Sequence, residues 1–257
     1  MYIVAAIIVF IATLIGAIFG IGGGIIIKPA MEAITGLPLA YINALSGITV
    51  LCMAVISLFR YLKSGAKLNL RILWMSVGAV AGGFLGKYLF DLMKTQLADR
   101  SARVLQCALL IGLLIFTLFK QHIKSFNVQS AVMLIASGLF MGTLSAFLGI
   151  GGGPINLLII YIIFSIDAKQ AAVYSVFVIL CSQIATVIFS TVTGGYAGMD
   201  MRLLYTMIPA AIAGGFIGPI LHKKWDLKRF EVYYNYLLYL LIALNIYNIV
   251  RVIWFTS

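Results

Sequence analysis

Charge is what this sequence has least of. Only 10% of its 257 residues are charged and 63% are hydrophobic, whereas soluble domains average roughly 25% charged and 45–50% apolar residues. Long polar stretches are also missing, so there is no room for a separate soluble domain. In a lipid bilayer, about 20 consecutive apolar residues make one spanning helix. The composition therefore predicts an all-α integral membrane protein.

Acidic residues are rarer than basic ones, with seven Asp and Glu against 18 Lys and Arg and a net charge of +11. A positive charge can indicate nucleic-acid binding, but here the basic residues lie in short gaps between apolar runs, where membrane topology explains them. We place the acids at segment ends or in loops, so the sequence shows no proton relay within a span. We expect the lipid bilayer as a partner and no nucleic acid.

Cysteine and histidine are too few and too scattered to form a metal or redox site. Cys52, Cys107 and Cys181 stand alone in apolar segments without CxxC spacing, and we interpret them as small buried hydrophobes. His122 and His222 follow or precede basic residues and are expected in solvated loops. No HExxH or GxSxG motif occurs. We therefore expect no metal, no cofactor and no enzymatic activity.

Apolar runs divide the chain into ten segments, most of them long enough to span a membrane. They cover residues 2–20, 24–36, 41–62, 71–92, 102–119, 128–148, 154–166, 170–193, 202–221 and 231–255. The first run lacks the basic start of a secretory signal, so we treat it as structure. Segments 24–36 and 154–166 are too short to span, and each follows three glycines. Each glycine run should therefore join two helices in a broken or re-entrant hairpin.

The same sequence blocks occur twice in the same order. GIGGG begins at Gly20 and again at Gly149, LNLRILW is matched by MDMRLLY, and AGGFLG is matched by AGGFIG. Such an order indicates an internal repeat. We expect two homologous halves, residues 1–124 and 125–257, joined by the polar segment 120–127. We interpret the AGGF glycines, which lie in long segments, as helix-packing residues.

The distribution of Lys and Arg orients these halves. Residues 60–71 are basic, as are 120–124 and 223–229, whereas residues 193–200, the counterpart of the first gap, contain no Lys or Arg. Because cytoplasmic loops are enriched in Lys and Arg, equivalent loops should lie on opposite faces. This predicts an inverted-topology repeat in which each half has a glycine-rich hairpin and three spanning helices. The basic stretch 87–103 does not fit, because this count places it outside.

The glycine runs predict a binding site. Irregular backbone within a membrane needs protein or water around it, because lipid cannot satisfy free N–H and C=O groups. A helix that starts after such a break presents unpaired N–H groups and a positive dipole end, which attract anions. Breaks from opposite faces would meet near the midplane, as in secondary transporters. The alternative is close helix packing. The glycines assigned to the site are Gly22, Gly23, Gly24, Gly151, Gly152 and Gly153.

Six polar residues near these glycines are candidates for contacting the anion. Lys28 could balance the anion's charge, or it could snorkel to the surface or pair with Glu32. Asn156 could donate to an oxyanion or satisfy the broken backbone. The remaining four could bind the anion or make hydrogen bonds between helices. These four are Asn43, Ser46, Ser175 and Gln183.

The doubled GxGGG element resembles the TauE/SafE family of sulfite exporters and related anion permeases. The matching residues are Gly20, Gly22, Gly23, Gly24 and Pro29 in the first half, and Gly149, Gly151, Gly152, Gly153 and Pro154 in the second. Because the two prolines stand at different distances from the glycines, the halves should line the site differently.

The resemblance implies a multi-pass secondary transporter for small sulfur-containing anions such as sulfite or organosulfonates, in the plasma membrane of a bacterium or archaeon. Two alternatives stay open, namely a transporter of another small organic anion and a non-transporting membrane partner subunit. The sequence does not specify the substrate, the direction of transport or the coupling ion. The oligomeric state is also undetermined, and a homodimer is compatible with the sequence.

Overall fold

The structure is a computed structural model, and it describes residues 1–119 and 126–255. All regular elements in these two ranges are helical. Eight of the described helices are long and apolar enough to cross a membrane. The expected all-α membrane architecture is therefore confirmed. His122 and the expected boundary between the halves lie outside the described residues.

The helices fall into two sets, one in each predicted half, and the first three helices of each set match in length. In the first half they are α1 (Tyr2–Phe19), α2 (Gly24–Ile34), α3 (Leu39–Lys63), α4 (Arg71–Gln96) and α5 (Asp99–Leu118). In the second half they are α6 (Ala131–Leu148), α7 (Pro154–Phe164), α8 (Ala168–Val192), α9 (Leu204–Lys224) and α10 (Leu227–Phe255), with the short 3-10 helix η2 (Met201–Leu203) before α9. Helices α1 and α6 both have 18 residues, α2 and α7 have 11, and α3 and α8 have 25.

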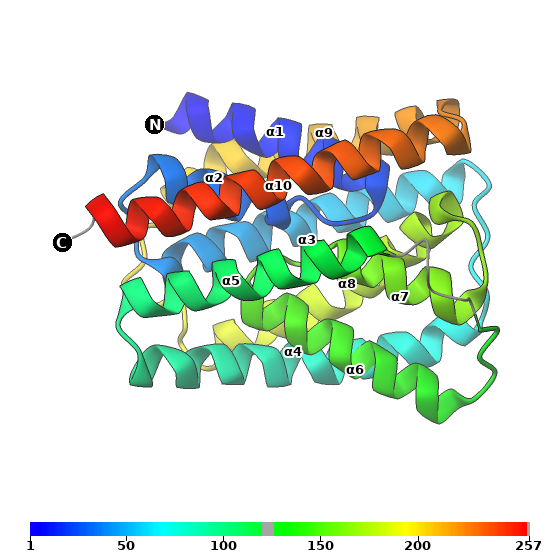
Figure 1. Ribbon diagram of the computed structural model, residues 1–257, viewed down its shortest axis with the longest axis horizontal. Helices are drawn as coiled ribbons and strands as arrows, with labels where there is room; N and C mark the ends of the chain where they lie inside the picture. Colours follow the sequence, from blue (N-terminus) through cyan, green and yellow to red (C-terminus); the bar gives the residue numbers. More distant parts are fainter. Residues whose placement is uncertain (120–125, 256–257) are drawn as a thin grey trace.

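The helices run side by side along the long axis of the molecule (Figure 1). Helix α1 packs on α9 at one edge, and α6 packs on α4 at the opposite edge. Helices α3 and α8 lie between these pairs, and α5 packs on α10 across one face. The contacts of α9 with α1 and α3 thus correspond to those of α4 with α6 and α8.

Glycines let the outer helix pairs approach closely. A Cβ on Gly78 of α4 would lie 1.9 Å from the Ile135 carbonyl oxygen of α6, and one on Gly138 would lie 1.8 Å from that of Met75. In the AGGF blocks, a Cβ on Gly83 would lie 2.5 Å from the Ser182 carbonyl oxygen. These glycines therefore serve helix packing, as interpreted from the sequence.

The basic stretch 87–103 is mostly helical, and the expectation of a polar loop there is wrong. Helix α4 continues to Gln96 and α5 begins at Asp99, so two residues connect them. Its charges are paired, because Lys87 contacts Asp91 at 2.5 Å, while Lys94 and Arg103 both contact Asp99. The i,i+4 spacing of Lys87 and Asp91 brings the two side chains together on one helix face.

Glu32 and His222 also lie elsewhere than expected. Glu32 is 6% exposed inside α2, so this acid is not in a loop or at a solvated segment end. His222 is 7% exposed in the last turn of α9, and the expectation of a solvated loop histidine is wrong. The cysteine expectation holds fully for Cys107, which is buried, while Cys52 and Cys181 are partly exposed.

Buried side chains satisfy the carbonyl ends of α1 and α6. Both helices end at a left-handed glycine, Gly20 with φ 67° and Gly149 with φ 66°. The Tyr61 hydroxyl donates to the Ala17 carbonyl, and His222 Nδ1 lies 2.7 Å from the Ile18 carbonyl oxygen. On α6, Gln106 donates to the Phe147 carbonyl and Lys28 to the Leu148 carbonyl. The last carbonyls of a helix have no partner within it, which explains why His222 is buried.

We expect Gly78→Ala to destabilise the protein by about 1–3 kcal/mol, because the new methyl group overpacks the α4–α6 contact. The measurement is thermal unfolding of the purified protein in detergent. Gly112→Ala in α5 is the matched control, since a Cβ there meets nothing within 4 Å. Unfolding of both variants at the wild-type temperature would contradict close packing at Gly78.

Candidate functional site

The two glycine runs lie against each other. We call residues 20–24 the first glycine segment and residues 149–153 the second. A Cβ on Gly22 would lie 2.9 Å from the Gly151 carbonyl oxygen, and one on Gly24 would lie 2.1 Å from that of Ile150. All residues of both segments except Gly149 are buried. Runs that are 129 residues apart in the sequence are thus brought into direct backbone contact.

These segments cross the centre of the molecule between α3 and α8. A Cβ on Gly151 would meet Val50, and Cβ atoms on Gly22 and Gly152 would meet Ile179. Val50 and Ile179 lie about halfway along helices of 25 residues each. Gly22, Gly151 and Gly152 have φ of +74°, +65° and +132°, a region that glycine adopts without strain. Glycine is therefore required both by the backbone conformation and by the lack of space.

Two helices begin where the segments meet. The N-cap residues of α2 and α7 are Gly23 and Gly153. Because glycine has no side chain, neither N-cap residue can accept a hydrogen bond through a side chain from the first N–H groups of its helix. Pro154 occupies the first turn of α7, where its missing N–H costs little. The first N–H groups of a helix have no partner within the helix. These two ends can therefore donate hydrogen bonds to a bound group.

Five of the six predicted polar residues carry buried side-chain atoms without a hydrogen-bond partner among the described residues. These atoms are Asn43 Nδ2 and Oδ1, Ser46 Oγ, Asn156 Nδ2 and Oδ1, Ser175 Oγ and Gln183 Oε1. More than nine in ten buried polar groups in proteins are paired, and leaving one unpaired costs roughly 1–3 kcal/mol. The alternative prediction is that these side chains make hydrogen bonds between helices, but the atoms named above make none to the described residues. Because these unpartnered atoms are numerous and several lie close to the glycine segments, we treat this region as the candidate binding site.

The polar residues line the glycine segments from both sides. Ser46 Oγ would lie 2.8 Å from a Cβ on Gly24, and the Asn43 side chain lies against Gly149. On α8, Ala172 contacts Gly20 and Ile179 contacts Gly22. Ser175 stands between these two positions at helical spacing and so belongs to the same face of α8. The structure thus brings residues of α3 and α8 to one place.

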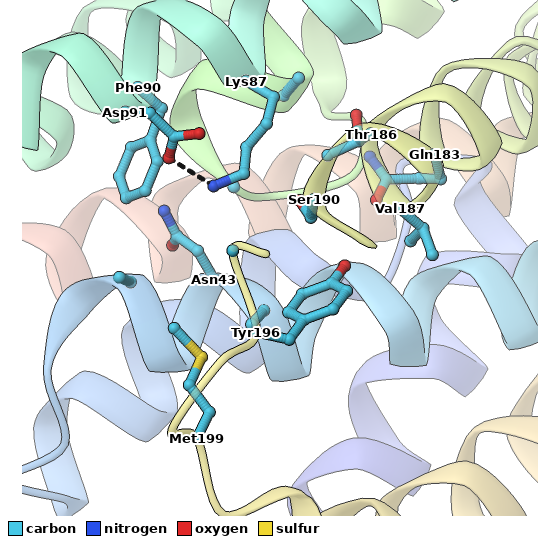
Figure 2. Close-up of a pocket in the computed structure, with 16 residues that line it drawn as sticks. Asn43, Lys87, Phe90, Asp91, Gln183, Thr186, Val187, Ser190, Tyr196 and Met199 are labelled. Carbon is cyan, nitrogen blue, oxygen red and sulfur yellow. Dashed lines mark hydrogen bonds and ion pairs between the residues drawn. The ribbon is translucent and has the colours of Figure 1, made fainter. Parts of the chain in front are cut away.

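Asn43 and Gln183 reach an open pocket, which we call the α3–α8 pocket (Figure 2). Gly149 also lines it, whereas the three-glycine runs, Ser46, Ser175 and Asn156 do not. Its water-accessible volume is about 80 Å³, and one water needs at least ~10–15 Å³. The pocket thus leads from solvent to Gly149, at the edge of the second glycine segment.

Lys87 supplies a positive charge in this pocket, and the sequence analysis did not select it. Figure 2 shows its ammonium group close to Asp91 and facing the same space as Asn43. The Lys87 side chain is 14% exposed and that of Asp91 is 43% exposed. The sequence offered one signal for Lys87. It directly follows AGGFLG in an apolar segment, and Asp91 stands four residues later, where the two side chains share a helix face.

Lys28 lies apart from the α3–α8 pocket. It is 4% exposed and therefore does not snorkel to the surface. Its ammonium group donates to Gln106 and to the Leu148 carbonyl. Among the predicted site residues, Lys28 thus contacts the end of α6 and not the pocket that holds Asn43 and Gln183.

Comparison with known proteins identifies the family. The sequence matches the family described as "Sulfite exporter TauE/SafE" over residues 5–246. A protein of Haemophilus influenzae described as "Probable membrane transporter protein" is 29% identical over 176 residues, which make up 66% of this chain and 65% of that protein. No solved structure matches this chain. Because the family match covers most of the chain and includes both glycine segments, the chain belongs to the TauE/SafE family of sulfite exporters.

Proposed function

We propose that the protein is a secondary transporter for small sulfur-containing anions such as sulfite or organosulfonates. The anion binds at the two glycine segments, and the binding site is exposed alternately to the two faces of the membrane. The observation that carries this proposal is the group of seven unpartnered polar atoms on Asn43, Ser46, Asn156, Ser175 and Gln183. Four of these atoms, Asn43 Nδ2, Asn156 Nδ2, Ser46 Oγ and Ser175 Oγ, can donate a hydrogen bond to an anion, whereas the three amide oxygens accept.

The chemistry of the region suits an anion. Helix N-termini carry a positive partial charge, and two of them begin at the glycine segments. Hydroxyl and amide groups add donors without requiring a buried counter-charge, which would be costly to desolvate. Lys87 at the pocket mouth adds attraction where water still reaches. An anion would therefore approach past Lys87 and bind to neutral donors deeper inside.

The arrangement of the helices supports an inverted repeat with the site near the membrane midplane. A shift of 129 residues relates Gly20 to Gly149 and Ser46 to Ser175. The Ser57 hydroxyl donates to the Gly215 carbonyl, and the Thr186 hydroxyl makes the corresponding contact with that of Gly83. The glycine segments meet beside the midpoints of α3 and α8. In the stretch 87–103, which fits this topology least well, Lys87, Lys94 and Arg103 are paired with acids.

The two sides of the glycine segments differ, since one is open to solvent and the other is closed by aromatic side chains, and this difference supports alternating access. Beside Asn43 the α3–α8 pocket is open, but beside α1 an aromatic cluster fills the related position. Tyr61 and His222 lie with ring centroids 5.0 Å apart, and Phe230 lies 5.7 Å from His222 and 5.0 Å from Phe19. The aromatic end lies near the basic residues 60–71 and 223–229, which supports a cytoplasmic position for it. We therefore infer that this conformation faces outward, in the plasma membrane of a bacterium or archaeon.

The proposal is tested by anion flux into liposomes that contain the purified protein. Sulfite, thiosulfate, sulfoacetate and taurine are compared with acetate as the carboxylate control. Flux of at least one sulfur compound, without flux of acetate, is the expected result. Flux of acetate alone would indicate a transporter of a different organic anion. Absence of all flux and of any anion-dependent thermal stabilisation would favour a partner subunit.

Gly24→Ala should lower anion flux at least tenfold, because its methyl group would collide with the Ile150 carbonyl at the contact between the segments. A tenfold loss corresponds to about 1.4 kcal/mol. Gly112→Ala, which has free space around its Cβ, should keep wild-type flux. The measurement is flux per folded protein, with folding checked by gel filtration. Wild-type flux from Gly24→Ala would argue against a site at this contact.

Gln183→Glu should weaken anion affinity at least tenfold, since it places a negative charge in the path with almost no change in shape. Gln170→Glu is the matched control, because Gln170 is exposed at the start of the same helix. Affinity is measured from the substrate concentration that gives half-maximal flux. Equal effects of the two substitutions would show that general surface charge, and not the pocket, is responsible.

Lys87→Gln should raise the half-saturating anion concentration while leaving maximal flux largely intact, because it removes attraction at the entrance. The difference from wild type should shrink with added salt, since the Debye length falls from about 10 Å at 0.1 M to about 3 Å at 1 M. Lys94→Gln is the control, as Lys94 pairs with Asp99 and does not line the pocket. An unchanged half-saturating concentration would exclude Lys87 from anion capture.

A further inference from the structure

A second polar cluster lies between α2, α5 and α10. Its central residue is Glu32, which is 6% exposed. Glu32 Oε1 and Asn248 Oδ1 have no hydrogen-bond partner in the described part of the chain. Glu32 Oε2 has the Cys107 thiol at 3.8 Å. A buried carboxylate with so few donors is costly in a membrane protein and marks a functional position.

Water can reach Glu32 from one side. Glu32 and Asn248 line a pocket between α2 and α10 with a water-accessible volume of about 280 Å³. On its inner side, Glu32 lines a space of about 10 Å³ together with Lys28, Gln106 and Leu148. The outer pocket accommodates many waters and the inner space about one. Glu32 therefore separates a wet pocket from a nearly dry one.

The charged groups around Glu32 already have their own partners. Lys28 on α2 donates to Gln106 and Leu148, and Arg251 on α10 donates to the carbonyls of Glu32 and Ala33. On α5, Arg103 pairs with Asp99 and also donates to the Leu37 carbonyl. Arg100, at the pocket wall, donates to the Ile253 carbonyl. The free carboxylate oxygen is therefore left without a donor among the described residues. Because the inner space beside it holds only about one water, the species that fits there is a proton.

The equivalent pocket of the second half, about 240 Å³ in volume, is lined by Lys228, Glu231 and Asn235 of α10, but among the described residues it has no buried acid. The shift of 129 residues relates Lys28 to Leu157 and Glu32 to Tyr161. Helix α7 forms without a charged residue, so the glycine-rich hairpin itself does not require this pair. A buried acid that the described residues place in one half only points to a role beyond holding the fold.

We propose that Glu32 is the proton-binding group that couples anion movement to the proton gradient. The proton passes from hydronium in the outer pocket to the Glu32 carboxylate, giving a carboxylic acid and water. After the change of conformation it passes from the carboxylic acid to a water on the opposite face, which restores the carboxylate and gives hydronium. Protonation removes a negative charge four residues from Lys28 on α2. Lys28 donates to the Leu148 carbonyl, and the next residue, Gly149, lies against the Asn43 side chain. The coupling to anion movement rests on the proposed transport function, whereas proton binding itself does not.

Infrared spectroscopy of the purified protein tests proton binding without any transport. Wild type should show a buried carboxylic acid band that changes with pH, Glu32→Gln should lack it, and Glu32→Asp should show it at a shifted frequency. Glu231→Gln, the same change at the other glutamate of the chain, should keep the wild-type band. A pH-dependent band that persists in Glu32→Gln, or the absence of one in wild type, would overturn the assignment.

Liposome flux then tests coupling, with thiosulfate and sulfoacetate as probes because sulfite itself takes up protons near neutral pH. An imposed pH gradient should change wild-type flux at least roughly fivefold, the lower range of coupling between sites. Glu32→Gln should exchange anions at equal pH but lose this response, and Glu32→Asp should retain part of it. A full response in Glu32→Gln, or none in wild type, would refute coupling at Glu32. Absence of flux in wild type would instead refute the proposed function.

Discussion

The structure depends on how it satisfies backbone groups at two interrupted helices inside an apolar molecule. Lipid offers no hydrogen bonds, so every free carbonyl and N–H group near Gly20 and Gly149 needs protein or water. The last carbonyls of α1 and α6 make hydrogen bonds with the side chains of Tyr61, His222, Gln106 and Lys28. The N–H ends of α2 and α7 receive no side-chain cap from the described residues. This difference leaves donors, and not acceptors, for a ligand, which is the arrangement that suits an anion.

The two halves use the same backbone solution with different side chains. At the end of α1 the partners are the aromatic and imidazole rings of Tyr61 and His222, which pack into a closed aromatic cluster. At the end of α6 they are Lys28 and Gln106, which belong to a polar cluster reaching towards water. A repeat that keeps its glycines but varies its partners can bind one solute at the centre while closing one side and admitting water on the other.

Charge is distributed according to access to water. The groups around the glycine segments are neutral amides and hydroxyls, because an unpaired charge there would cost several kcal/mol to desolvate. Lys87 and Asp91 stand at the pocket wall, where solvent reduces that cost. Glu32 and Lys28 are the buried charges of α2, and Glu32 lines a separate pocket. In the mechanism that we propose, the anion and the proton therefore enter by different pockets.

The sequence alone determined the membrane class and indicated where helices break, and its repeated blocks predicted two halves. These follow from local properties, since apolar length decides whether a helix can span and glycine runs favour a break in a helix. It also indicated Asn43, Ser46, Asn156, Ser175 and Gln183, which lie in the helices that follow the breaks. Helix ends such as those of α4 and α5 were less predictable, because charged residues paired at i,i+4 continue a helix that composition alone would end.

Only the tertiary structure decided which side chains meet. Lys28 is close to Gly24 in sequence but faces the end of α6, whereas Lys87, more than 60 residues further on, reaches the pocket with Asn43 and Gln183. His222 is buried because a carbonyl on α1 requires a partner, and nothing near His222 in sequence reveals that carbonyl. The physical reason is that helical periodicity fixes the face of one helix, while the neighbour of that face depends on how all the helices pack.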